Sequence, residues 1–188
     1  VTKQVSFYEE MTNVPFIIAG PGIHPRQKPV EDLLTQPTID LLPTLCELAG
    51  IPVPSSKPGI SLAPFLKGEK QKRQHPYAAS EWHSEYEVTV SPGRMIRSPR
   101  YKYTHYLEGN GEELYDMLKD KGERRNLAHD PKYSKILAEH RALLDDYIRR
   151  TQDDYRSLKV EADKRWRSHA PGYPNHEGPC ARDIINRK

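Results

Sequence analysis

The chain has 188 residues, with 29 Lys and Arg against 26 Asp and Glu, a net charge of +3 at pH 7, and an apolar share of 36%. This length is enough for a domain with a buried core, and so balanced a charge gives little long-range attraction to nucleic acid or to a membrane surface. No apolar run reaches the roughly 20 residues that span a bilayer. We therefore expect no nucleic-acid partner and no membrane span.

The first part of the chain has the pattern of an α/β edge. Residues 14–19 (VPFIIA) are a continuous apolar run before a Gly-Pro-Gly turn, which is typical of a strand buried on both faces of a parallel sheet. Further on, apolar residues at helical spacing follow Asp40 and end at Gly50, which predicts a helix with these two residues as its caps. Residues 1–58 are thus predicted to be one strand and one helix at the end of an α/β domain.

A second pattern begins after the Pro-rich linker at residues 52–59 (PVPSSKPG). Residues 100–107 alternate with a period of two, as a half-buried strand does. Shorter runs of the same kind predict further strands of a small antiparallel sheet, at residues 77–82, 94–98 and 113–117.

A long helix is predicted after this sheet. Asp130 and Pro131 supply an N-cap and a first helical residue, and apolar side chains then recur at helical spacing to residue 148. Residues 59–150 are therefore predicted to be an α+β subdomain, and residues 151–188 a charged tail that contains Pro and His.

Three segments, in this order, resemble the C-terminal part of a type I sulfatase of the alkaline-phosphatase-like superfamily. They are residues 8–22 (YEEMTNVPFIIAGPG), 39–50 (IDLLPTLCELAG) and 112–130 (EELYDMLKDKGERRNLAHD). The resemblance covers about residues 3–150 and departs from the common pattern at Lys121, where Pro is usual. It implies that an N-terminal catalytic half, with the nucleophile and most metal ligands, belongs to the intact enzyme. The third segment is interpreted as structural, with Asp and Asn side chains that cap turns.

Type I sulfatases use a formylglycine, made from Cys or Ser in a Cys/Ser-x-Pro-x-Arg motif, together with calcium. The sequence has no such motif, and its His and Cys residues show no spacing typical of metal ligands. The resemblance therefore implies calcium and formylglycine in the intact enzyme. We expect that this chain alone binds no metal and is inactive.

Lys3 is the one catalytic residue that the resemblance suggests. Family members carry a basic residue that contacts sulfate four positions before the aromatic residue of the first segment. Here that position is Gln4, and Lys3 lies one residue further from Tyr8. A lysine ammonium is a compact donor suited to sulfate oxygens. The other interpretation of Lys3 is a solvated lysine.

Residues 81–97 (EWHSEYEVTVSPGRMIR) resemble the heparan N-sulfatase (sulfamidase) branch of the family. In that branch the C-terminal subdomain helps to line the sugar pocket. The resemblance gives Glu87, Arg94 and His83 as substrate-binding residues, since carboxylates and guanidinium groups bind sugar hydroxyls and anionic sugars. Their other interpretations are an exposed carboxylate, a charge on a strand surface and a half-buried hydrogen-bonding histidine.

The sequence thus predicts the C-terminal part of a periplasmic or extracellular sulfatase that hydrolyses sulfate esters or sulfamates of a carbohydrate, with a glycosaminoglycan as the expected substrate. Two alternatives stay open. One is a phosphodiesterase or phosphonate hydrolase of the same superfamily. The other is a non-catalytic module that binds sulfated glycans.

Overall fold

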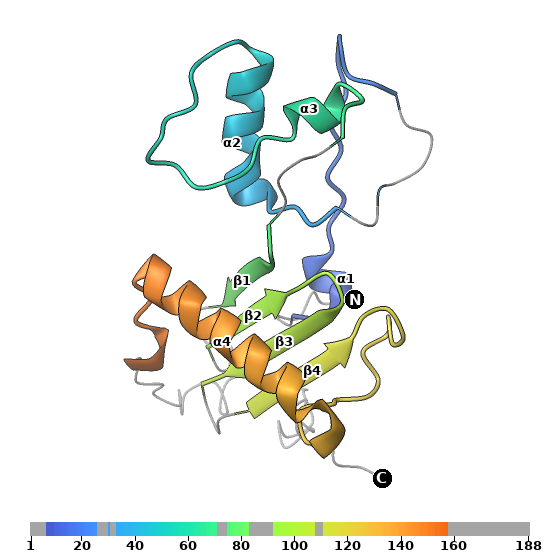
Figure 1. Ribbon diagram of the computed structural model, residues 1–188, viewed down its shortest axis with the longest axis vertical. Coiled ribbons are helices and arrows are strands. Elements are labelled where there is room, and N and C mark those ends of the chain that lie inside the picture. The colour runs from blue at the N-terminus through green and yellow to red at the C-terminus, as the bar shows by residue number, and fades with distance from the viewer. Residues whose placement is uncertain are drawn as a thin grey trace, which may run out of the picture. The chain divides into compact units, whose positions relative to one another are not determined.

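The computed structural model describes residues 7–25, 30, 33–70, 75–82, 92–107 and 111–157 (Figure 1). The chain divides into two compact units, one of Asn13–Ala78 and one of Val1–Thr12 with Ala79–Lys188. The predicted boundary between residues 58 and 59 falls inside the first of these units. No helix within the described ranges is long and apolar enough to cross a membrane.

The larger unit contains the predicted small sheet, with strand order β1-β2-β3-β4. The β2–β3 and β3–β4 pairs are antiparallel, with Ile96 opposite Tyr103 and Tyr103 opposite Leu114. These three side chains are almost fully buried and share one face, because directly opposed residues point the same way. The strands confirm the sheet predicted from the sequence and are β1 Ala78–Trp82, β2 Gly93–Arg97, β3 Tyr101–Tyr106 and β4 Gly111–Asp116.

The long helix α4, Ser134–Thr151, lies across one face of this sheet (Figure 1). As predicted, Asp130 caps the helical start, since its carboxylate accepts a hydrogen bond from the Lys132 amide. A short 3₁₀ turn, η2 Pro131–Tyr133, leads from this cap into α4. Leu137, His140 and Leu144 are the buried residues of α4, one from each of three successive turns. This spacing confirms the amphipathic helix expected for the C-terminal subdomain.

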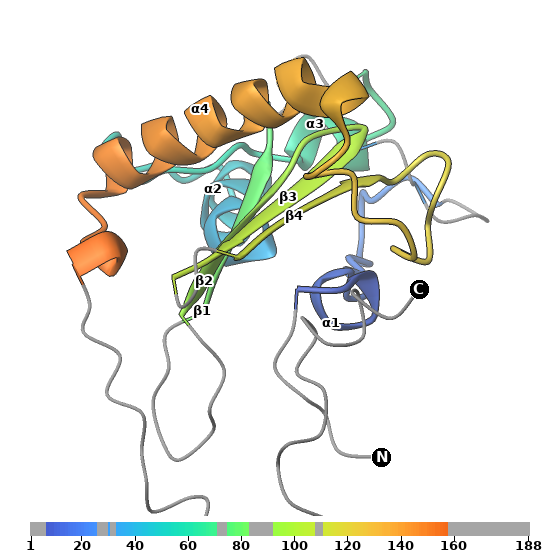
Figure 2. The same ribbon diagram turned by 90° about the horizontal axis from the view of Figure 1, so that it is seen from below.

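The opposite face of the sheet is covered by Phe7 and the short helix α1, Glu9–Thr12, which lies on the side away from α4 (Figure 2). The Phe7 ring packs 5.9 Å from the ring of Tyr106, and the Tyr8 ring lies 6.4 Å from that of Tyr115. A Cβ atom on Gly93 would approach the Phe7 ring to 2.7 Å. The sheet therefore has two covered faces.

The smaller unit is built around α2, Pro37–Leu48, and the short helix α3, Ala63–Leu66. The C-cap of α2 is Ala49, one residue before the predicted Gly50. Gly50 follows with a φ of 68°, and the amide of the next residue bonds back to the Cys46 carbonyl. The prediction of Asp40 as the N-cap is wrong, because the helix begins earlier, with Gln36 as its cap. Asp40 lies inside the helix and is fully buried.

The apolar run at residues 14–19 is not a strand in this structure. Val14 and Ile17 are exposed by 54% and 85%, where the pattern predicted burial on two faces. A parallel strand needs a neighbouring strand for its backbone groups, and the described part of the chain pairs none with this run. Apolar side chains of α2 are also exposed by 41–50%, namely Leu41, Leu42 and Leu45.

Gly59 makes a close approach to α2 that permits no side chain. Its φ is +113°, and an added Cβ would lie 2.1 Å from the carbonyl oxygen of Ile39. That carbonyl lies four residues before Pro43, which has no N–H to bond it. We expect Gly59→Ala to lower the free energy of unfolding by roughly 2–4 kcal/mol, measured by urea titration.

The matched control for this substitution is Gly20→Ala, because no atom lies within 4 Å of a Cβ added there. Unfolding curves that coincide for the two variants would show that the close approach at Gly59 is not needed.

Candidate functional site

Of the four residues predicted to form the site, the structure describes Arg94. Lys3, His83 and Glu87 lie outside the described residues, so their roles stay predictions. Among the residues that are described, no group of three or more His, Cys, Asp or Glu side chains is arranged to hold a metal ion.

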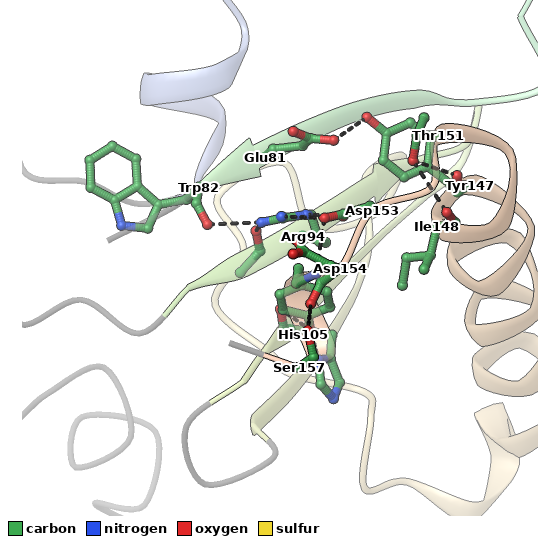
Figure 3. Close-up of polar contacts among 12 residues, drawn as sticks. Glu81, Trp82, Arg94, His105, Tyr147, Ile148, Thr151, Asp153, Asp154 and Ser157 are labelled. Atoms are coloured by element: carbon green, nitrogen blue, oxygen red, sulfur yellow. Dashed lines mark hydrogen bonds and ion pairs between the residues drawn. The ribbon is translucent and has the colours of Figure 1, made fainter. Parts of the chain in front are cut away.

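Arg94 lies in β2, opposite His105 of β3, and is only 3% exposed. Its guanidinium forms a two-pronged ion pair with Asp153, with Nε 2.6 Å from Oδ2 and Nη2 2.8 Å from Oδ1. Nη1 donates to two backbone carbonyls, at 2.9 Å to Trp82 and 2.8 Å to Gly93 (Figure 3). The side chain thus joins β1, β2 and the turn that follows α4.

Tyr155 completes the surroundings of this guanidinium. Its ring centroid lies 4.4 Å from Cζ of Arg94, a cation–π distance, and its hydroxyl contacts Nδ1 of His105. Burial lowers the pKa of Arg94, but the hydrogen bonds and charge of Asp153 outweigh it and hold that pKa above its usual value. Burial raises the pKa of Tyr155 to about 12. At neutral pH the guanidinium is therefore charged and the tyrosine is neutral.

A second link joins the same end of α4 to β1. The hydroxyl of Tyr147 donates to the carboxylate of Glu81 at 2.6 Å (Figure 3). Burial, followed by this bond to Glu81, raises the pKa of Tyr147, so the hydroxyl keeps its proton. Glu81 and Trp82 are the last two residues of β1, so both links hold the end of that strand.

On the other face of the sheet lies the Lys102 cluster, which we define as Glu9, Arg97, Lys102, Glu113 and Glu123. Lys102 is fully buried, with Nζ 2.7 Å from Glu9 Oε1 and 2.9 Å from Glu123 Oε1. It also donates to the Phe7 carbonyl at 2.8 Å. The Glu9 amide in turn donates to Glu123 Oε2 at 2.7 Å. The cluster therefore links the first segment of the resemblance, residues 8–22, to the third, residues 112–130.

The charges of this cluster balance if Glu113 is protonated. Lys102 and Arg97 are the two cations, and the carboxylates of Glu9 and Glu123 neutralise them. Burial, and then the charge of Glu123, raises the pKa of the 6% exposed Glu113 to about 7. The third carboxyl group is therefore about half protonated near pH 7 and largely neutral one pH unit lower.

This raised pKa makes stability depend on pH. Glu113 titrates at about 7 in the folded chain and near 4.5 when unfolded, so the folded chain binds more protons between these values and stability falls as the pH rises through them. We expect Glu113→Gln to remove this loss. The unfolding free energy of the Glu113→Gln variant, relative to that of the unaltered chain, should increase from pH 4.5 to 7. The difference should then level off, at about 3 kcal/mol or less.

The measurement is a series of urea unfolding curves from pH 4.5 to 8. The exposed residue Glu139 of α4 provides the control variant, Glu139→Gln. A difference between Glu113→Gln and the unaltered chain that stays constant over this range would contradict the assigned titration.

The third family segment is structural, as predicted. Asn126 Oδ1 accepts bonds from the amides of Leu114 and Ala128, and its Nδ2 donates to the Glu112 carbonyl. Asp116 pairs with Arg100 at 2.7 Å. These side chains hold the segment that follows β4 against the strands of the sheet.

Sequence reasoning missed the residues that hold Arg94 and the first family segment. Asp153 and Tyr155 lie in the segment predicted as a charged tail, and Lys102 has the polar position of an alternating strand. No local signal marks these residues, because their partners lie 59 and 95 residues away in the sequence.

Residues 3–150 match the family model described as N-sulphoglucosamine sulphohydrolase, C-terminal. The chain is 76% identical, over all 188 residues, to the Delta 4,5-hexuronate-2-O-sulfatase of Bacteroides thetaiotaomicron. It spans 39% of that relative's length.

Solved structures agree with this match. A 2-O GAG sulfatase is 77% identical with a TM-score of 0.84, over 98% of this chain and 40% of that chain. A protein in complex with its substrate D-glucosamine-2-N,6-O-disulfate is 27% identical with a TM-score of 0.55, over 62% of this chain and 25% of that one. The chain belongs to the type I sulfatase family and corresponds to the C-terminal part of its members.

Proposed function

We propose that the full-length protein that carries this chain is a sulfatase that removes a 2-O-sulfate from a Δ4,5-unsaturated hexuronate of a glycosaminoglycan. The observation that carries this proposal is the 76% identity to the Delta 4,5-hexuronate-2-O-sulfatase across every part of the chain. The 2-O GAG sulfatase, at 77% identity, supports the same substrate class. Both relatives favour an O-sulfate ester over the sulfamate that the sequence had left open.

In this proposal the chemistry of sulfate cleavage is supplied by the part of the protein outside this chain. The resemblance implies a formylglycine nucleophile and a calcium ion in that part, and the ion would supply positive charge to the sulfate oxygens. Lys3 adds a positive charge at the sulfate, while Glu87 and His83 contact the sugar. Arg94 is the third residue assigned to sugar binding. We also propose a periplasmic or extracellular location, because a sulfated polysaccharide is met outside the cytoplasmic membrane.

Residues 1–58 are proposed to complete the catalytic α/β domain. The exposed apolar residues Val14, Ile17, Leu41, Leu42 and Leu45 support this, because a surface of this kind is typical of a face that another part of the protein covers. The chain spans only about two fifths of its sulfatase relative, so a large part of that fold lies outside it.

The test is the release of inorganic sulfate from a Δ4,5-unsaturated disaccharide with a single 2-O-sulfate. We expect the full-length protein to release one sulfate per disaccharide, and the 188-residue chain alone to release none above a heat-denatured control. No release by the full-length protein, with formylglycine present and calcium supplied, would overturn the proposal. Turnover by the chain alone would overturn the assignment of the chemistry to the remainder of the protein.

A further inference from the structure

We propose that the segment between β4 and α4 is a surface that binds sulfated glycosaminoglycan chains. We call residues 118–132 the basic loop, and its cations are Lys119, Lys121, Arg124, Arg125 and Lys132. The inference rests on the proposed function, since it takes the same class of glycan. It adds a contact to this class of glycan that neither the resemblance nor the four predicted site residues include.

The basic loop carries an excess of positive charge on its surface. It has five Lys and Arg against three Asp and Glu, which is +2 out of the net +3 of the whole chain. All five cations are exposed, and the side chain of Arg125, which pairs with Asp130, is still 73% exposed. Most of the net charge of the chain is therefore concentrated in this short segment.

The three acids of the basic loop are bound to the interior or to the backbone of the loop. The Glu123 side chain is 2% exposed and pairs with the buried Lys102. Asp120 and Asp130 each accept a hydrogen bond from a backbone amide of the loop, at 2.9 and 3.1 Å. The acids thus stabilise the shape of the loop, while the cations face solvent.

The backbone of the basic loop is ordered by bonds to β4. The Leu127 amide donates to the Leu114 carbonyl at 2.8 Å. The Asn126 side chain bonds the Leu114 amide and the Glu112 carbonyl, both at 3.0 Å. The loop, drawn in yellow, projects from the sheet beside β4 (Figures 1 and 2). A surface that is already ordered loses less conformational entropy when it binds a ligand.

The chemistry of the basic loop fits a sulfated polysaccharide better than a nucleic acid. Residues 118–132 contain no Phe, Tyr or Trp, whereas proteins that bind single-stranded nucleic acids stack the bases on aromatic side chains. Sulfate and carboxylate groups along a glycan are bound by charge-assisted hydrogen bonds from Lys and Arg. The proposed substrate is a polymer with these groups.

The test is calorimetric binding of a size-fractionated heparin oligosaccharide to the full-length protein at physiological ionic strength. The variant carries Lys119→Gln, Arg124→Gln and Lys132→Gln together. We expect its affinity for heparin to fall roughly 5–50-fold, because several exposed ion pairs are lost at once. The difference should shrink at higher salt, which screens such pairs. Each single variant should show part of the loss, so the result does not depend on the folding of one protein.

The matched control carries Arg149→Gln, Arg150→Gln and Arg156→Gln, which removes the same charge from the same unit. These arginines are also exposed, but each pairs with Asp145 or Asp146, so we expect heparin affinity within about twofold of the unaltered protein. A further variant, Lys119→Arg with Lys132→Arg, keeps the charge and should keep the affinity.

Equal losses of heparin affinity in the two triple variants would overturn the inference, because net charge alone would then explain the binding. Tighter binding of a single-stranded oligothymidylate through the same three residues would overturn it as well. The binding measurement does not depend on sulfate release. Full-length protein that binds heparin through the basic loop but releases no sulfate would therefore contradict the proposed function and leave this inference standing.

Discussion

Lys102→Met should lower the free energy of unfolding by about 3–5 kcal/mol, although it replaces one side chain with another of similar length. The lysine ammonium is the common partner of Glu9, Glu123 and the Phe7 carbonyl. The Glu123 side chain is only 2% exposed, so removal of Lys102 leaves a buried carboxylate without its cation. An uncompensated buried charge costs far more than the net gain from forming the pair.

The measurement for Lys102 is urea unfolding at pH 6, where Glu113 is largely protonated. Lys135→Met is the control, since Lys135 is exposed on α4 and lysine and methionine have similar helix propensities. A double variant, Lys102→Met with Glu123→Gln, should regain part of the lost unfolding free energy, because it also removes the uncompensated charge of Glu123. Equal stability of Lys102→Met and Lys135→Met would contradict the role assigned to the Lys102 cluster.

Asp40→Ala should have the second largest effect, about 3 kcal/mol or more of lost unfolding free energy. The Asp40 carboxylate is fully buried and accepts the amides of Gln36, at 2.7 Å, and Ile60, at 2.8 Å. Its Oδ1 also lies 2.7 Å from Nε2 of His75. Without the carboxylate, two backbone N–H groups lose their partners, and the segment around Ile60 keeps only its other link to α2, from the Leu62 amide to Thr44 Oγ1.

Hydrogen exchange at the Ile60 amide reports this link directly. In Asp40→Ala we expect that amide to lose protection, together with the amide of Gln36. Asp40→Asn should behave similarly, because a carboxamide turns one acceptor into a donor that faces an N–H group. Glu47→Ala, an exposed position on the same helix, serves as the control. Unchanged protection of Ile60 in both Asp40 variants would rule out this anchor.

The C-terminal subdomain could be predicted from the sequence because its signals are local. The period-two pattern of residues 100–107 and the cap at Asp130 each depend on neighbouring residues, and β3 and α4 follow them closely. The run at residues 14–19 gave an equally clear strand pattern. A buried parallel strand depends on hydrogen bonds to neighbouring strands. The described part of the chain pairs no strand with this run, so the apolar pattern alone does not produce a strand.

The interior of the candidate site could not be predicted, because its contacts are long-range. An alternating strand usually exposes its polar residues, yet Lys102 is fully buried because Phe7 and Glu9 cover that face. Likewise, the resemblance drew attention to Arg94 as a sugar contact. Its bonding to Asp153 follows from a turn after α4 that carries no motif.

The central claim is that the full-length protein cleaves a 2-O-sulfate ester. The most direct measurement compares kcat/KM for two unsaturated disaccharides that differ only in carrying one 2-O-sulfate on the hexuronate or one N-sulfate on the glucosamine. We predict measurable sulfate release from the 2-O-sulfated sugar and none from the N-sulfated one. Release of the N-sulfate alone, or of neither sulfate, would contradict the account.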